Sequence, residues 1–110
     1  MADEVLLALS TFPDRITAQR IAEELVVGHY AACANVASTV DSIYWWKNEV
    51  ETASEVLAFF KTTADRFPAF QEKLKSLHPY ETPEVISFRV DHGSREYLQW
   101  VAENCSLLRR

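Results

Sequence analysis

The chain's most informative polar side chains flank a short loop bracketed by two prolines. His78 lies at the predicted end of a helix, and Glu84 follows six residues later, beyond Pro79 and Pro83. Because proline fixes its own backbone angle, such a loop can hold an imidazole and a carboxylate in a fixed relation. A nitrogen and an oxygen donor together suit Cu(II), Zn(II) or Ni(II) better than Ca(II). His78 and Glu84 are therefore a candidate pair of metal ligands, to be completed by water or by a neighbouring subunit.

A purely structural interpretation of the same two residues stays open. A histidine at the C-terminal end of a helix is stabilised by the helix dipole, and Glu84 can simply begin the next strand. His29 follows a helix-ending glycine and His92 lies in an Asp-His-Gly turn, so we interpret both as surface residues. The sequence contains no C-x-x-C and no H-x-x-x-H, which excludes a closed structural zinc site on ligand spacing.

Other chemically active side chains are interpreted as structural. Glu49, Glu51 and Glu55 alternate along one predicted strand, a pattern typical of a solvated face, although an acidic row can also collect cations. Cys33 lies among alanines, which favours a buried core thiol over a nucleophile, because free cysteine is one of the most buried residue types. We do not expect it to pair with Cys105.

Composition and charge exclude several classes of function. The 110 residues carry a formal net charge of −5, so nucleic acid and anionic membrane are poor partners. Two glycines cannot build a glycine-rich phosphate loop. An enzyme like acylphosphatase would need such a loop after the first strand, where Ser10–Asp14 stands instead, and no G-x-S-x-G motif is present. We therefore expect no catalytic activity.

The sequence predicts neither export nor membrane insertion. It opens with the acidic stretch Met1–Glu4, and the apolar run Val5–Leu9 is too short for the hydrophobic region of a signal peptide. No stretch approaches the roughly 20 apolar residues that cross a bilayer. We expect a cytoplasmic protein with both thiols reduced.

The elements that must position the candidate ligands form one predicted α+β domain over residues 1–110. The order of strands and helices is that of the ferredoxin-like split βαβ fold, a four-stranded antiparallel sheet with helices on one face, here followed by a C-terminal helix. The expected elements are a strand at 5–9, a helix capped by Asp14 and ended by Gly28, strands at 33–46 and 49–62, a helix from Thr63 or Asp65 to Leu77, a strand at 86–90 and a helix capped by Ser94.

The two middle strands predict a hairpin too long for so small a domain. Arms of roughly 14 residues span about 45 Å, whereas a domain of this size has a radius of gyration of about 13 Å. Its tip, at Lys47-Asn48, follows Tyr44, Trp45 and Trp46. Such rings are usually buried, which favours an oligomer in which the arm packs on a neighbouring subunit. The alternative is an arm that bends at a bulge near Ser38-Thr39 and packs on its own sheet.

Five short motifs occur in a fixed order from Val5 to about Asn104. They are Ala31–Asn35, Ile43–Trp46, Thr62-Thr63, Leu77–Glu84, and His92-Gly93 followed by Tyr97–Trp100. Together they resemble the CutA family of divalent-cation tolerance proteins. The resemblance implies a ferredoxin-like fold and a tight homotrimer in which the hairpin extends over a neighbouring subunit, an architecture similar to that of the PII signalling proteins.

The resemblance also implies a metal site. The family's proposed ligands map to His78 and Glu84, together with a cysteine at the end of the first strand, where this sequence has Ser10. Without that thiolate we expect a weaker and harder site. The function so predicted is a non-catalytic trimer that binds divalent metal, with Cu(II) favoured, and contributes to cation tolerance. The alternative is a PII-like signalling or scaffold trimer that binds a small ligand or a protein in the clefts between subunits.

Overall fold

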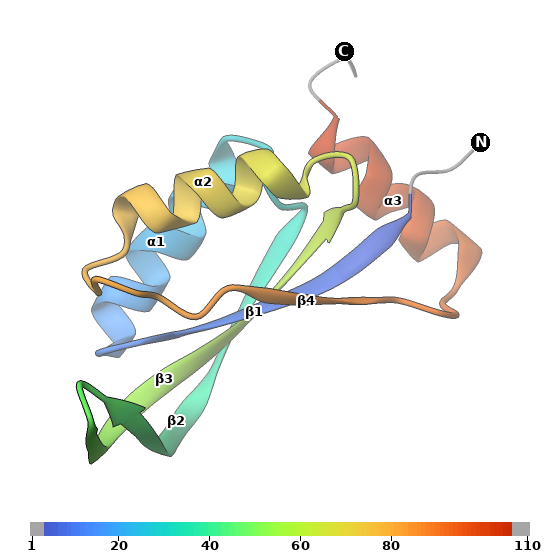
Figure 1. Cartoon of the computed structure of the whole chain (residues 1–110). Coiled ribbons are helices and arrows are strands. Elements are labelled where there is room, and N and C mark those ends of the chain that lie inside the picture. Colours follow the sequence, from blue (N-terminus) through green and yellow to red (C-terminus); the bar gives the residue numbers. More distant parts are fainter. Residues whose placement is uncertain (1–3, 107–110) are drawn as a thin grey trace.

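Seven helices and strands follow one another in the computed structural model, which describes residues 4–106 (Figure 1). They are β1 (Val5–Phe12), α1 (Arg15–Val27), β2 (Cys33–Trp46), β3 (Glu49–Thr63), α2 (Phe67–Leu77), β4 (Ile86–Arg89) and α3 (Arg95–Cys105). All neighbouring strands are antiparallel, in the order β2-β3-β1-β4. The predicted ferredoxin-like α+β fold is therefore confirmed. The acidic opening residues 1–3, and residues 107–110 of the predicted domain, lie outside the described part.

The sequence predicted both ends of α1 correctly. The Asp14 carboxylate accepts a hydrogen bond from the Thr17 backbone N–H at 2.8 Å, and Gly28 ends the helix. Ile16, an apolar residue of the first turn, does not belong to the buried stripe, because its side chain is 79% exposed. The stripe that packs on the sheet is formed by Ala18, Ile21, Ala22 and Leu25, which recur at helical spacing.

The start of α2 differs slightly from the prediction. The helix begins after Arg66 rather than after Thr63 or Asp65, and no side chain caps it as an N-cap would. The Thr63 hydroxyl instead accepts from the Arg66 N–H at 3.2 Å, which forms a turn just before the helix. Pro68 occupies the first turn, where the missing N–H has no intrahelical partner to lose.

The main core lies between the sheet and the helices α1 and α2. Successive strand residues point to opposite faces, so Ala8 and Phe12 of β1 and Ala58 and Phe60 of β3 share the face that these helices cover. A second, smaller cluster lies at the other end of the sheet, where α3 packs. Its buried members are Val5, Ala32, Val101 and Cys105.

The opposite side of the sheet is apolar as well. By strand pairing, Leu9 lies opposite Phe59 and Ile86, and Leu7 lies opposite Phe88. Ile86 and Phe88, the two apolar residues of β4, are 43% and 54% exposed. We call this surface the open face; its members are Leu7, Leu9, Leu57, Phe59, Ile86 and Phe88.

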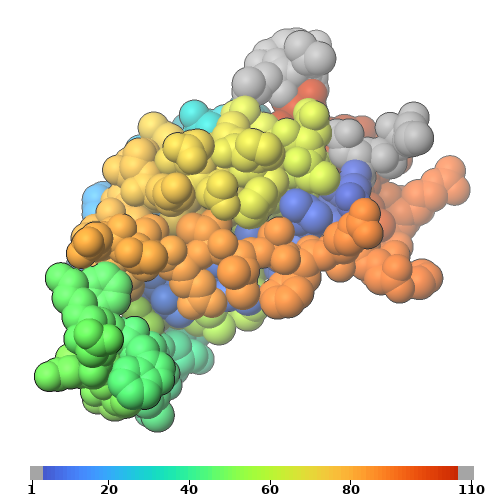
Figure 2. Space-filling model, in the orientation of Figure 1, coloured from blue at the N-terminus to red at the C-terminus, as the bar shows by residue number. Residues whose placement is uncertain are grey.

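The predicted long hairpin is present and projects from the rest of the chain (Figures 1 and 2). The molecule measures 47 × 25 × 23 Å. Lys47 and Asn48 form the tip with φ of 52° and 71°, as a two-residue turn requires. One extra residue shifts the register of β2 between Val36 and Thr39, where the sequence suggested a bulge, and the Arg15 guanidinium donates to the Ala37 carbonyl there at 2.7 Å.

Candidate functional site

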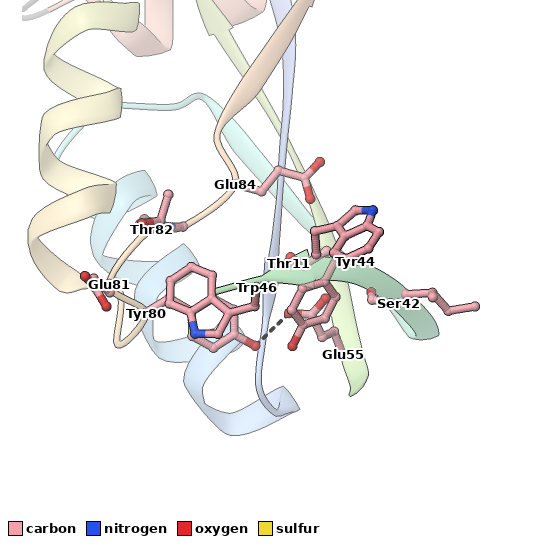
Figure 3. Close-up of a pocket in the computed structure, with 12 residues that line it drawn as sticks. Thr11, Ser42, Tyr44, Trp46, Glu55, Tyr80, Glu81, Thr82 and Glu84 are labelled. Carbon is pink, nitrogen blue, oxygen red and sulfur yellow. Dashed lines mark hydrogen bonds between the residues drawn. The ribbon is translucent and has the colours of Figure 1, made fainter. Parts of the chain in front are cut away.

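A cavity of about 680 Å³ lies between the distal hairpin, the end of β1 and the loop that follows α2 (Figure 3). Its lining is acidic and aromatic. The carboxylates are Glu55, Glu81 and Glu84; the rings are Tyr44, Trp45, Trp46 and Tyr80. No lysine, arginine or histidine is among the described residues that line it. The cavity therefore favours a positively charged occupant.

Strand pairing in the hairpin places two of these rings beside a carboxylate. Val40 pairs with Glu55, Tyr44 with Glu51 and Trp46 with Glu49, so Tyr44 and Trp46 share one face of the hairpin with Glu55. The prediction of a solvated acidic row holds for Glu49 and Glu51, which are exposed. It is wrong for Glu55, which is only 8% exposed because the loop after α2 reaches over it.

Tyr80 connects that loop to the hairpin. Its hydroxyl donates a hydrogen bond to Glu55 Oε2 at 2.7 Å (Figure 3). Burial, then the hydrogen bond and the negative charge of Glu55, raise the pKa of Tyr80 well above its usual range, and Tyr44 adds to this effect. The Tyr80 hydroxyl therefore stays protonated and keeps the loop closed over the carboxylate.

His78 is turned inward and is only 7% exposed. Its Nε2 lies 2.8 Å from the Thr11 carbonyl oxygen, and its Nδ1 lies 3.1 Å from the Tyr80 backbone N–H. Since a carbonyl only accepts and a backbone N–H only donates, the proton must be on Nε2 and the ring is neutral. The ring stacks on Phe12, and burial is the main cause that lowers the pKa of His78, against the opposing effects of Thr11 and Glu55.

The two predicted metal ligands occupy different surroundings. Glu84 is exposed and lines the cavity, whereas His78 is not among the lining residues. A metal at His78 would have to replace one of its two hydrogen bonds. Among residues 4–106, no three His, Cys, Asp or Glu side chains come close enough together to hold a metal ion. Within one described chain the pair is therefore incomplete, and it stays a prediction.

Ser10, at the position of the family's cysteine, lies in the core. Its side chain is fully buried on the helix-covered face of β1, and its Oγ has no hydrogen-bond partner among the described residues. The next residue, Thr11, is the one that lines the cavity.

The cysteines and the other histidines lie away from the cavity. Both thiols are free, and Cys105 is buried. The prediction that Cys33 is buried is wrong, since its half-buried thiol lies 3.5 Å from the Tyr97 hydroxyl. His29 contacts the Asn104 carbonyl at 2.9 Å, and His92 is exposed as predicted. No helix in the described chain is long and apolar enough to cross a membrane.

Residues 6–104 match the family model described as CutA1 divalent ion tolerance protein. The chain belongs to the CutA1 family. It is 42% identical over 98 residues to the divalent-cation tolerance protein CutA of Thermus thermophilus, covering 89% of this chain and 95% of that protein. A solved structure of the divalent cation tolerance protein Cut A1 from that organism superimposes with a TM-score of 0.90 at 40% identity, over 93% of this chain and 99% of that one.

A more distant CutA structure extends the likeness. The CutA of Archaeoglobus fulgidus, described as a periplasmic divalent cation tolerance protein, is 29% identical and superimposes with a TM-score of 0.89 over 93% of this chain and 99% of that one. The family membership predicted from the motifs is thus confirmed.

Sequence reasoning missed the pairing of Glu55 with Tyr80 and of both with the hairpin rings. A signal was available: counting backwards from the predicted Lys47-Asn48 turn pairs position 46 with 49 and position 40 with 55. That count places Glu55 on the face of Tyr44 and Trp46. No comparable signal marked Tyr80, because its contact with Glu55 spans 25 residues through an irregular loop.

Proposed function

We propose that this chain forms a homotrimer that binds divalent cations, with Cu(II) favoured, and contributes to cation tolerance without catalysis. The observation that carries the proposal is the cavity, whose lining by residues 4–106 holds three carboxylates and no basic side chain. Membership of the CutA1 family supports the same role. Carboxylate oxygens attract divalent metal, and a nitrogen donor shifts the preference toward Cu(II) and Zn(II).

Within this proposal Glu84 is the first ligand and His78 the second. Glu84 is exposed on the cavity wall and needs no rearrangement. His78 binds metal through Nδ1 once the Tyr80 amide is displaced, since the lone pair on that nitrogen is the one now accepting the Tyr80 N–H. Water or a neighbouring subunit supplies the remaining ligands.

The trimer is supported by apolar surface that one chain leaves uncovered. Ile86 and Phe88 of the open face and Ile43, Trp45 and Val50 of the hairpin are exposed. Patches of this kind mark surfaces that other protein covers. A cytoplasmic location is part of the proposal and is supported by the two free thiols.

Metal titration of the assembled, metal-free protein tests this function. Calorimetry with Cu(II) and Zn(II) is expected to give saturable binding, with Cu(II) the tighter. Glu84→Ala and His78→Ala should each weaken Cu(II) binding about tenfold or more, the range found when metal-site groups are removed. Glu51→Gln, an exposed carboxylate of the same hairpin outside the cavity, is the control and should bind as the wild type does.

Two results would contradict the proposal. One is the absence of saturable binding for either metal, and the other is indistinguishable binding by wild type, Glu84→Ala and His78→Ala. Because His78 is buried, circular dichroism must first establish that its variant folds; Glu84 is exposed, so its variant carries the test alone if needed.

The second candidate function is a PII-like signalling or scaffold trimer. The specific observation in its favour is the size of the cavity, which lies within the roughly 300–1,000 Å³ typical of small-molecule pockets. Saturable binding of a small ligand together with no metal affinity would favour this alternative.

A further inference from the structure

The hairpin and the loop after α2 direct aromatic rings toward a common space. Tyr44 and Trp46 come from β2 and Tyr80 from the loop, and Figure 3 shows all three near Glu55. Aromatic faces attract cations because the ring carries negative charge on its faces. The Trp46 ring already lies against one ammonium group of the chain, that of Lys47, whose Nζ is 5.5 Å from the ring centre.

Glu55 supplies a negative charge at the inner end of this space. The side chain is more than nine-tenths buried, and its Oε2 accepts the Tyr80 hydroxyl. Within residues 4–106 its other oxygen receives no hydrogen bond, and no lysine, arginine or histidine forms an ion pair with it. A buried carboxylate without a cationic partner is unfavourable, so a positive group in the cavity would provide the missing charge.

The side chains around Glu55 suit an organic cation better than a bare metal ion. Metal ions such as Mg²⁺ and Ca²⁺ need about six or more oxygen ligands, whereas no three candidate ligand side chains of the described chain are close enough together. An ammonium ion needs only one carboxylate and flanking ring faces. The remaining lining acids, Glu81 and Glu84, are exposed at the rim, and the cavity of about 680 Å³ is large enough for a small organic molecule.

We propose that this cavity binds a small organic ammonium ion, held by the Glu55 carboxylate and the rings of Tyr44, Trp46 and Tyr80. The site goes beyond the divalent-metal function proposed above and does not depend on it, since neither His78 nor Glu84 is among its principal contacts. The expected ligand is a free molecule of low molecular weight that carries a primary or quaternary ammonium group.

Calorimetric titration of the assembled, metal-free protein with butylammonium and tetramethylammonium chloride tests the proposal. Ionic strength is held constant with sodium chloride, and tert-butanol serves as the uncharged analogue of similar shape. We expect saturable binding of at least one of the two ammonium ions and none of tert-butanol. Glu55→Gln should weaken binding about tenfold, and Trp46→Leu about fivefold, as loss of a charge partner and of a cation–π contact predict.

Each variant has a matched control. Glu72→Gln removes an exposed carboxylate of α2, and Trp100→Leu removes a partly exposed indole from α3; neither residue lines the cavity. Both controls should bind ammonium as the wild type does. Glu55→Gln keeps an oxygen that accepts the Tyr80 hydroxyl, so the loop contact is retained.

Three outcomes would overturn the proposal: no saturable binding of either ammonium ion, equal binding of tert-butanol, or unchanged affinity in both Glu55→Gln and Trp46→Leu. Because no divalent metal is present in these titrations, their failure leaves the metal proposal standing. Equally, a protein that binds ammonium but neither Cu(II) nor Zn(II) would fail only the metal proposal.

Discussion

Both ring nitrogens of His78 are engaged inside the chain, one by the Thr11 carbonyl and the other by the Tyr80 N–H. These two partners require a neutral ring with its proton on Nε2. A second proton on Nδ1 would face the Tyr80 donor and break the contact that fixes the start of the loop. The fold therefore selects one protonation state of this side chain.

The stability of the protein should consequently fall between pH 7.5 and 5.5. Burial lowers the pKa of His78 below its usual 6.5, so as the pH drops the unfolded chain takes up a proton before the folded chain does. The stabilisation is complete above about pH 6.5 and is lost as the pH falls through the lowered pKa. Urea unfolding at the two pH values, at one fixed protein concentration, measures this change in the free energy of unfolding.

His78→Gln is the control for that measurement, because glutamine stays polar and does not titrate. The loss of stability between the two pH values should be smaller in the variant than in the wild type. An equal loss in both proteins would show that the protonation of His78 does not cause the pH dependence of stability. Circular dichroism at pH 7.5 establishes that the variant is folded before the comparison is made.

Residue types and spacing predicted the candidate ligands, but not the direction in which they point. Glu84 lines the cavity. The His78 ring instead turns toward a carbonyl 67 residues earlier in the chain, a contact that arises only when α2 packs against the sheet. In the same way, the sequence places Ser10 on a strand, while the isolation of its buried hydroxyl depends on the surrounding core.

At the scale of elements, local signals succeeded where the cause is local. Asp14, Gly28 and the Lys47-Asn48 tip act through their own backbone and nearest neighbours, and all three were predicted. The start of α2 and the exposure of Ile16 were not, because they depend on which neighbours happen to pack there. The cavity belongs to this second kind, since three separate elements form its walls.

The hairpin tip should be sensitive to the shape of residue 48. Asn48 has φ of 71°, a left-handed conformation that asparagine tolerates and a β-branched residue does not. Asn48→Val should therefore destabilise the tip by about 1–2 kcal/mol. Hydrogen exchange should become faster at the amides of β2 and β3 near the tip, while β1 keeps the wild-type rate because local opening need not reach the core.

Asn48→Gly serves as the comparison, because glycine adopts positive φ without strain. It should exchange like the wild type at the same amides. Wild-type exchange in Asn48→Val would contradict the turn geometry, and faster exchange throughout both variants would indicate an effect other than backbone strain.

At the scale of the whole molecule, the sheet has one face covered by α1 and α2 and an open face that remains apolar. A single chain leaves Ile86 and Phe88 exposed there, next to a projecting arm with further exposed rings. Closed, symmetric assembly is the usual way in which identical chains bury such apolar surfaces. The trimer expected from the sequence thus has a specific surface to bury.

Light scattering should give about three protomer masses, persisting on dilution to micromolar protein. Phe88→Glu places a charge in the open face and should produce monomers, because burying an unpaired charge is strongly unfavourable. Ile16→Glu is the control: Ile16 is an exposed apolar residue at the start of α1, outside the open face, and its variant should stay trimeric. A monomeric wild type at micromolar concentration, or a trimeric Phe88→Glu, would contradict the assignment of the open face.

The extra residue in β2 between Val36 and Thr39 has a further consequence, which is to shift the phase of the strand. Side chains alternate between two sides, so one insertion exchanges the sides for every residue beyond it. Before the shift, Asn35 lies on the same side as the odd-numbered residues of β3. After the shift, the even-numbered residues of β2 lie on that side. If the pairing counted from the Lys47-Asn48 tip continued without the extra residue, Asn35 would take the helix-covered side, and Ala34 and Val36, which now pack against the main core, would take the other. The insertion therefore lets one strand serve two purposes: its distal part places Tyr44 and Trp46 beside Glu55, and its first residues still contribute to the core.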